Sequence, residues 1–350
     1  MHNGLADYIT AMPKVELHVH LEGATQPETL LRLARRNHIA LPADTVEGIR
    51  EWYTFTDFPH FVEIYYKICE CIRTPDDIEL LAREFLAGQA AQNIRYSEVI
   101  YTPSIHYLQQ GIAFEDQLAA LNRAREWAET ELGVSMGLIL DIDRSGAPEG
   151  APLTYEWARS NLGNGVVALG MGGYEPGYPP ENFAEIYERA HAAGVPCVLH
   201  AGETAGPESV RGALRVGRAR RIGHGVRCLE DPALVEVLRE RQIPLEVCPT
   251  SNICLGVFDR FENHALPHLL EAGLYVTLNS DDPPMFNTTL TDEYRKAADI
   301  FGLDVGTIEQ LVINAVRASL LTHSAKASLE RDYYAAFGRL RQAYLVRNDE

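Results

Sequence analysis

Two histidines near the start of the chain, His18 and His20, are the first residues whose types and spacing could support chemistry. They lie two positions apart in a β-rich run, and on a β-strand this spacing places both imidazoles on the same face. Two imidazoles on one face can bind one cation. A His-x-His pair on a strand is more often structural, so the pair predicts a metal site only if other segments add ligands.

Three later segments contain histidines and carboxylates that could complete such a site. They are His200-Ala201-Gly202-Glu203, Ile222-Gly223-His224-Gly225 and Ser280-Asp281-Asp282-Pro283. Three imidazoles and one carboxylate suit zinc, or a similar borderline ion, better than magnesium or calcium. A two-metal barrel site usually needs a bridging lysine on the fourth strand, and residues 166–172 contain no lysine. We therefore expect one Zn²⁺ ion per chain.

The acidic residues of these segments suggest further roles. Glu203 follows His200 after a flexible Ala-Gly step, so it can point into a pocket as a proton donor without binding the metal. Its alternative role is a negative charge at the start of a helix near Pro207. Asp281 and Asp282 are neighbours with diverging side chains, so one can bind metal while the other contacts a substrate. Their alternative role is helix capping.

Eight β-rich runs, separated by helical patterns, would position these residues. The runs are Val15–Leu21, Arg95–Tyr101, Met136–Ile142, Val166–Gly172, Val195–His200, Arg221–Val226, Pro244–Cys248 and Tyr275–Asn279. Eight parallel strands, each followed by a helix, close a (β/α)8 barrel of the TIM type. The candidate residues lie at the carboxyl ends of these runs, which converge on one face of such a barrel.

The segments outside this repeat predict additional helices around a single domain of residues 1–350. The long stretch between the first two runs includes the aromatic-rich segment Trp52–Tyr66, which we expect to form helices over the barrel mouth. The chain after Ala315 has helical patterns that we expect to cover the outside of the barrel. The segment Pro180–Gly194 predicts a helix that begins at the proline and ends at a left-handed glycine.

The composition restricts the partners of the chain. A net charge of −18 from 49 acidic and 31 basic residues repels polyanions, so nucleic acid and anionic membranes are poor partners. The segment Met1–Thr10 lacks the basic start and apolar stretch of a secretory signal, which favours a cytoplasmic location. Six scattered cysteines indicate reduced thiols rather than a disulfide scaffold. The oligomeric state is left open.

Four separated segments together resemble the adenosine deaminase family in order, spacing and length. They are Met12-Pro13-Lys14-Val15-Glu16-Leu17-His18-Val19-His20-Leu21-Glu22-Gly23, His200-Ala201-Gly202-Glu203, Gly223-His224-Gly225 and Leu278-Asn279-Ser280-Asp281-Asp282-Pro283. The segment Cys248-Pro249-Thr250-Ser251-Asn252 is also similar to that family, and the resemblance covers nearly the whole chain. It implies that zinc is held by His18, His20, His200 and Asp281.

The resemblance also implies catalytic roles for Glu203, His224 and Asp281. Glu203 would protonate N1 of a purine, and His224 would orient and deprotonate the attacking water beside the metal. Protonation of N1 makes C6 electrophilic, so hydroxide adds there and ammonia leaves. The reaction implied is hydrolytic deamination of a 6-aminopurine, in which an adenosine-type nucleoside becomes an inosine-type product.

Substrate contacts are implied for His20, Glu22, Gly173 and Asp282. Asp282 would hydrogen-bond to N7, and the backbone N–H of Gly173 would reach N3. Glu22, however, stands where adenosine-specific members carry an aspartate that contacts the ribose. The segments Phe55-Thr56-Asp57-Phe58, Phe61–Tyr66 and Asp281-Asp282-Pro283-Pro284-Met285-Phe286 look more like other branches. The alternative substrates are therefore adenine and 6-aminodeoxyfutalosine, a precursor of menaquinone.

Two other functions have different signatures. A barrel hydrolase that cleaves an amide or phosphoester would use the same metal but would not need Asp282. A catalytically idle purine-binding protein would need neither Glu203 nor a hydroxide-generating metal. The second type of zinc deaminase is excluded because the chain has neither its His-x-Glu motif nor its Pro-Cys-x-x-Cys motif.

Overall fold

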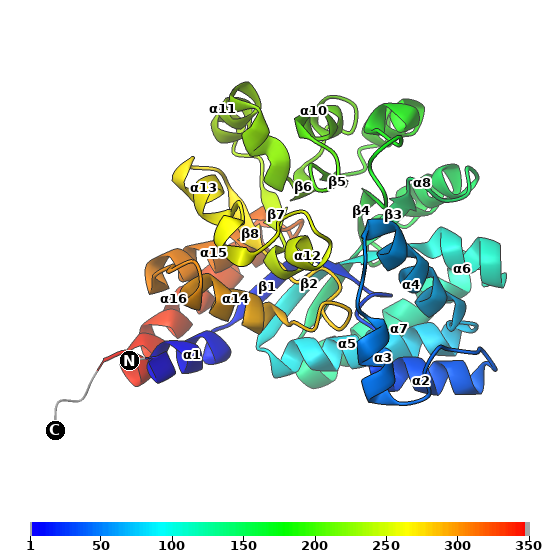
Figure 1. Ribbon diagram of the computed structural model, residues 1–350, viewed down its shortest axis with the longest axis horizontal. Helices are drawn as coiled ribbons and strands as arrows, with labels where there is room; N and C mark the ends of the chain where they lie inside the picture. The colour runs from blue at the N-terminus through cyan, green and yellow to red at the C-terminus, as the bar shows by residue number, and fades with distance from the viewer. Residues whose placement is uncertain (1, 347–350) are drawn as a thin grey trace.

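Eight parallel strands form the centre of the computed structural model, which describes residues 2–346. Neighbouring strands pair in chain order from β1 to β8, and Figure 1 shows them gathered at the centre with helices around them. They are β1 Lys14–His20, β2 Ile94–Tyr101, β3 Ser135–Asp143, β4 Val166–Gly172, β5 Cys197–Ala201, β6 Arg221–His224, β7 Leu245–Val247 and β8 Val276–Leu278. The predicted (β/α)8 barrel is confirmed. The predicted single domain of residues 1–350 includes Met1 and residues 347–350, which lie outside the described residues.

The barrel closes between its first and last strands just beyond β8. Asp281 forms a parallel bridge with Val19 of β1. The N–H of His20 donates to the carbonyl of Asp281 at 2.9 Å, and the N–H of Asp281 donates to the carbonyl of His18 at 3.1 Å. The backbone contacts that close the barrel therefore also place Asp281 beside the two histidines of β1.

The predicted strand bounds agree with the observed ones to within two residues at each end. The largest differences include the end of β6, which stops at His224 instead of Val226. His224 and Gly225 have φ angles of 59° and 69°. This left-handed backbone cannot continue an extended strand, so the chain turns at the barrel mouth.

The helices alternate with the strands around the barrel. The α-helices are α1 His2–Ala11, α2 Pro27–Arg36, α3 Val46–Trp52, α4 Phe58–Glu70, α5 Pro75–Ala91, α6 Pro103–Gln110, α7 Phe114–Leu132, α8 Gly150–Ser160, α9 Ala184–Ala192, α10 Pro207–Arg215, α11 Pro232–Arg241, α12 Pro249–Cys254, α13 Leu266–Glu271, α14 Leu290–Asp299, α15 Val305–Ala318 and α16 His323–Tyr344. The 3-10 helices are η1 Pro180–Phe183, η2 Val226–Glu230 and η3 Phe261–Asn263. The helix expected from Pro180 is divided into η1 and α9, and Gly194 beyond it has the expected positive φ of 73°.

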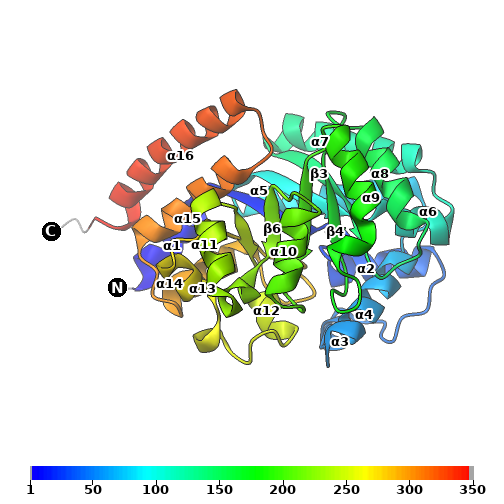
Figure 2. The same ribbon diagram turned by 90° about the horizontal axis from the view of Figure 1, so that it is seen from above.

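The expected extra helices are present after β1 and at the end of the chain. Figure 2 shows α3, α4 and α12 at one end of the barrel, while α16 runs along the opposite side. Asp57 caps α4, because its carboxylate accepts from the N–H of His60 at 2.9 Å. On α16, only Tyr333 and Phe337 are buried. No helix among residues 2–346 is long and apolar enough to cross a membrane.

Candidate active site

The donor atoms of His18, His20, His200 and Asp281 meet at the carboxyl ends of β1, β5 and β8. All four lie within 4.8 Å of one another. Asp281 Oδ1 is 3.3 Å from Nε2 of His18 and 3.3 Å from Nε2 of His20. Nε2 of His20 is 3.1 Å from Nε2 of His200. The fold thus brings together the four side chains for which the sequence predicts metal binding.

This donor set fits a divalent metal ion. Nε2 of His18 is buried and forms no hydrogen bond with any of residues 2–346, although Oδ1 of Asp281 lies 3.3 Å from it, as expected for a nitrogen whose partner is a metal. Three imidazole nitrogens and one carboxylate oxygen are ligand types that zinc binds in tetrahedral sites. The side chains of His18 and Asp281 are almost completely buried, and that of His20 is 12% exposed. The site can therefore be reached from the cavity on the His20 side.

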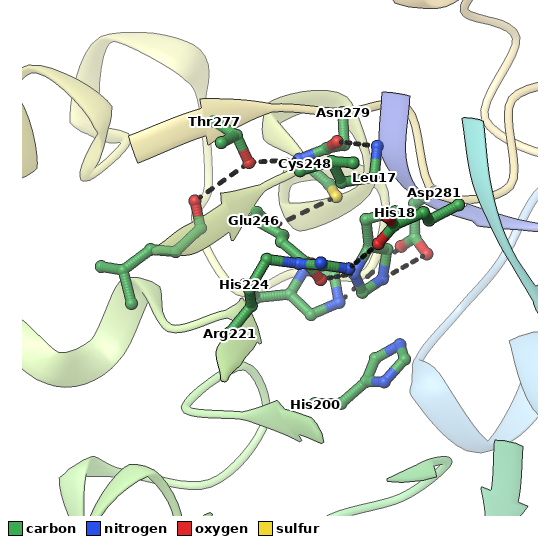
Figure 3. A network of polar contacts seen from close by, with 12 residues as sticks. Leu17, His18, His200, Arg221, His224, Glu246, Cys248, Thr277, Asn279 and Asp281 are labelled. Carbon is green, nitrogen blue, oxygen red and sulfur yellow. Dashed lines mark hydrogen bonds and ion pairs between the residues drawn. The ribbon is translucent and has the colours of Figure 1, made fainter. Parts of the chain in front are cut away.

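A buried ion-pair network holds His18 from behind (Figure 3). Nδ1 of His18 is 2.9 Å from Oε2 of Glu246. Glu246 is also paired with Arg221, whose guanidinium lies 2.6 Å from Glu98. Burial alone would raise the pKa of Glu246, but the charge of Arg221 and the contact with His18 lower it below its ordinary value. A carboxylate behind an imidazole fixes the ring so that Nε2 faces the metal position.

His224 and Asp281 have unusual backbone conformations at the site. Their φ angles are 59° and 66°, in the left-handed region that L residues seldom adopt. Nε2 of His224 lies 3.6 Å from Oε1 of Glu203 and 4.0 Å from Oδ2 of Asp281. Strained residues of this kind persist where the surrounding structure over-determines them, and they cluster at active sites.

Glu203 lies on a loop that a second carboxylate holds in place. Glu175 accepts hydrogen bonds from the backbone N–H groups of Gly202, Glu203 and Thr204 at 2.8–2.9 Å. Burial would raise the pKa of Glu175, but the charge of Arg144 and these hydrogen bonds lower it. Oε1 of Glu203 itself is buried without a partner. Burial raises the pKa of the Glu203 carboxyl well above its usual range, and the charge of Asp281 adds to this effect.

Asp282 follows Asp281 and also lines the cavity at the barrel mouth. Its Oδ1 is buried and has no hydrogen-bond partner. Gly23 lies directly against it, and a Cβ atom at Gly23 would come within 1.6 Å of that oxygen. Only glycine leaves room for the carboxyl group at this point. Burial, together with the charge of Asp281, raises the pKa of Asp282.

A cavity joins these residues to the helices of the barrel mouth. Its lining includes His20, Gly173, His200, Glu203, His224, Asp281 and Asp282. The opposite wall is formed mainly by α4, through Phe58, Phe61, Val62, Tyr65 and Tyr66. The aromatic segment expected to cover the mouth therefore forms one wall of the cavity.

Glu22 is the predicted substrate contact that does not line this cavity. Its side chain is buried behind the wall, where Oε1 accepts from the N–H of Thr102 at 2.9 Å and lies 3.2 Å from Nε2 of His106. Its Oε2 has no partner in the protein. The local fold thus gives Glu22 a structural role, and its contact with a substrate stays a prediction.

Sequence reasoning missed several residues that support the site. Glu246 and Glu175 are carboxylates in or just after a strand, a pattern that could have marked them as candidates. Arg144, whose guanidinium donates to the carbonyl of His200 at 2.6 Å, follows β3 in the same way. Asn252 and His264, which lie behind His224, are far apart from it in the chain, so no local pattern links them.

Comparisons with known proteins show which family the chain resembles. The family model described as adenosine deaminase matches residues 13–335. An aminodeoxyfutalosine deaminase of Streptomyces avermitilis is 41% identical and covers 95% of this chain and 94% of its own length. An adenine deaminase of Bordetella parapertussis is 40% identical and covers 90% of this chain and 98% of its own.

A solved structure is similar over nearly the whole length of the chain. The zinc-bound crystal structure of an amidohydrolase from Burkholderia ambifaria superimposes with a TM-score of 0.91 at 25% identity, covering 99% of this chain and 96% of its own. The match of the family model over nearly the full length, together with the two relatives at 40% identity or more, leaves one conclusion. The chain belongs to the adenosine deaminase family.

Proposed function

We propose that this chain hydrolyses the C6 amino group of a 6-aminopurine and releases ammonia. The observation that carries this proposal is the gathering of the four metal donors with Glu203 and Asp282 around one cavity. Both acids carry a buried oxygen with no hydrogen-bond partner among the described residues. A purine offers ring nitrogens on either side of its amino group, and these could satisfy such oxygens.

The metal that we propose for the four donors is a single Zn²⁺ ion. The zinc-bound relative and the histidine-rich donor set support this choice. When bound, zinc would lower the pKa of a water molecule and supply hydroxide near neutral pH.

The protein groups around the cavity would bind and activate the purine. Glu203 would hold a proton and give it to N1, which makes C6 electrophilic. Asp282 would hydrogen-bond to N7, and the N–H of Gly173 would reach N3. His224 would contact the oxygen that adds to C6, because its Nε2 lies beside Glu203 and Asp281. The buried cavity would exclude bulk water and so strengthen these contacts.

For the natural substrate we propose 6-aminodeoxyfutalosine. The relatives named for this activity and for adenine deamination favour these two alternatives over the adenosine-type nucleoside that we took as the main expectation. The Streptomyces relative covers 95% of this chain, and the segment after β8, Asp281–Phe286, resembles the same branch. Phe286 is buried against the cavity wall, where its ring stacks on Phe61 at 5.5 Å.

The polar end of the cavity supports a substrate with a group at N9. Asp143 lines the cavity and accepts from Ser145 and from the hydroxyl of Tyr66. Beyond this contact lies a second hollow, which shares Tyr66, Ile105 and Asp143 with the first. A free base has no group to place there, whereas a hydroxylated N9 substituent could bind Asp143 in place of Tyr66.

A steady-state comparison of four substrates tests the proposal. Adenine, adenosine, 2′-deoxyadenosine and 6-aminodeoxyfutalosine would be followed by the loss of absorbance at the adenine band. We expect the highest kcat/KM for 6-aminodeoxyfutalosine. The highest value for adenine would overturn our choice of substrate, and no turnover of any of the four would overturn the proposed deamination.

A hydrolase that cleaves an amide or phosphoester at the same metal is the main rival. The two differ in their need for Asp282, which only a purine would require. We expect Asp282→Asn to lower kcat/KM for the preferred purine. Unchanged purine turnover would show that the contact to N7 is wrong.

A further inference from the structure

A chain of buried hydrogen bonds runs from the start of α13 to His224. The N–H of Leu266 donates to Nδ1 of His264 at 3.1 Å. Nε2 of His264 lies 3.2 Å from Oδ1 of Asn252 in α12, and Nδ2 of Asn252 lies 3.3 Å from Nδ1 of His224. His264, Asn252 and His224 are each 1% exposed or less. These contacts are therefore shielded from bulk water.

The direction of these hydrogen bonds is fixed by the first donor, the N–H of Leu266. A backbone N–H can only donate, so Nδ1 of His264 must accept. A neutral imidazole carries one proton, and that proton is then on Nε2. His264 is packed between the rings of Phe258 and Phe301, and burial lowers its pKa to about 3. His264 is therefore neutral and donates from Nε2.

The proton on Nε2 of His264 in turn fixes the orientation of the side-chain amide of Asn252. The amide oxygen must face Nε2–H of His264, because a flipped amide would oppose two donors. The NH2 group of Asn252 consequently faces Nδ1 of His224. That nitrogen must accept, which a doubly protonated His224 could not do.

We propose that Asn252 and His264 hold His224 as the neutral tautomer with its proton on Nε2, so that His224 donates a hydrogen bond to the oxygen that adds to C6. The nature of that oxygen rests on the proposed function. Nε2 of His224 is 3.6 Å from Glu203 and 4.0 Å from Asp281. Both distances are too long for a direct hydrogen bond, so the N–H is available to an atom placed between them.

This assignment changes the role that the sequence implies for His224. An imidazole with its proton on Nε2 cannot also accept a proton at that nitrogen. The proton lost by the attacking water must therefore pass to a carboxylate oxygen, and Glu203 and Asp281 are the carboxylates beside Nε2. Asn252 and His264 act through His224, so we regard them as positioning residues.

Nitrogen NMR of zinc-loaded protein labelled with ¹⁵N-histidine tests the tautomer directly. The chain has 12 histidines, and the His224 signals would be identified by their loss in His224→Gln. We expect Nδ1 of His224 in the range of an unprotonated ring nitrogen and Nε2 in the range of a protonated one. The reverse pattern, or two protonated nitrogens, would overturn the proposal. This test does not require a substitution of Asn252 or His264.

Two substitutions of His264 test the origin of the tautomer. His264→Gln keeps an N–H that can donate to Asn252, whereas His264→Leu removes it. We expect His264→Leu to shift the His224 nitrogen signals and to lower kcat at least ~10-fold with little change in KM, and His264→Gln to restore much of both. If the His224 signals in His264→Leu were identical to those of the wild type, the hydrogen bonds through Asn252 and His264 would not set the tautomer.

The His224 spectrum tests the tautomer, and the turnover of 6-aminopurines tests the proposed function. A protein with the expected His224 spectrum that deaminates no 6-aminopurine would overturn the proposed function and leave the tautomer assignment in place. Active deamination by a protein whose His224 is protonated on Nδ1 would overturn the tautomer assignment and leave the proposed function in place.

Discussion

The cavity has a floor, formed by the ends of the barrel strands and the loops after them, and a lid, formed by the wall that α4 contributes. The floor and the lid are built in different ways. On the floor, buried polar groups hold some of the residues around the cavity in place. Glu246 lies behind His18, and Glu175 holds the loop of Glu203. On the lid, α4 presents Phe58 and Phe61, whose rings are 5.6 Å apart and contact other rings instead of charged groups.

This difference suggests a division of labour. Hydrogen bonds and ion pairs are directional, so they can fix the position of a reacting group to a fraction of an ångström. Apolar ring contacts are less directional and set mainly the shape and dryness of the cavity. Changes on the floor should therefore lower kcat or metal affinity, and changes on the lid should raise KM.

The largest effect is expected on the floor, for Glu203→Gln. A glutamine cannot give a proton to N1, so we expect kcat to fall ~10²- to 10⁴-fold while zinc content is unchanged. Elemental analysis and steady-state kinetics would measure both. Glu208→Gln, at an exposed position of α10, serves as a control with near-normal turnover. Undiminished activity in Glu203→Gln would remove this residue from the reaction.

A second floor substitution, Glu246→Gln, tests the support behind the metal. The glutamine leaves Arg221 with one buried carboxylate, Glu98, in place of two. We expect roughly 10- to 100-fold weaker zinc binding, measured by competition with a chelator, and a loss of about 3–5 kcal/mol in the free energy of unfolding. Glu236→Gln, whose ion pair with Arg239 is exposed, should change neither. Wild-type zinc affinity in Glu246→Gln would contradict the role of this network.

At the border between floor and lid, Asp143→Ala tests the N9 end of the cavity. Loss of a hydrogen bond to a charged group costs about 1.5–3 kcal/mol, so kcat/KM for 6-aminodeoxyfutalosine should fall roughly 10- to 100-fold. Adenine has no N9 substituent and is the internal control, with kcat/KM little changed. Equal losses for the two substrates would indicate that Asp143 does not contact this group.

The smallest effect is expected on the lid, for Phe61→Leu. The leucine removes ring contacts with Phe286 and Phe58 worth about 1 kcal/mol, so KM should rise roughly fivefold with kcat almost unchanged. Phe337→Leu on the remote helix α16 is a matched control, because Phe337 is also buried. A fall in kcat instead of a rise in KM would show that the lid also positions reacting groups.

The barrel could be predicted from the sequence because its signals are local. Each strand lies in a short run of the β-rich type, such as Val166–Gly172, and β4 has the predicted bounds. The end of β6 was placed too late because the left-handed backbone of His224 is a consequence of the surrounding site. Nothing in the neighbouring residues indicates a positive φ at a histidine.

The gathering of the four candidate metal donors could be predicted, but the residues that support them could not. His18, His20, His200 and Asp281 lie at strand ends, and the barrel topology alone brings such ends together. Asn252 and His264 reach His224 through side-chain contacts between segments after β6 and β7. Glu22 shows the reverse case. Its position near His20 in the chain suggested that it lines the cavity, but its contacts with Thr102 and His106 hold it away from the cavity.

Anomalous X-ray diffraction at the zinc edge, on crystals of the active protein, tests the central claim most directly. The account predicts one peak per chain at about 2.0–2.2 Å from Nε2 of His18, Nε2 of His20, Nε2 of His200 and a carboxylate oxygen of Asp281. An active protein with no peak among these four side chains, or with its zinc held elsewhere, would contradict it.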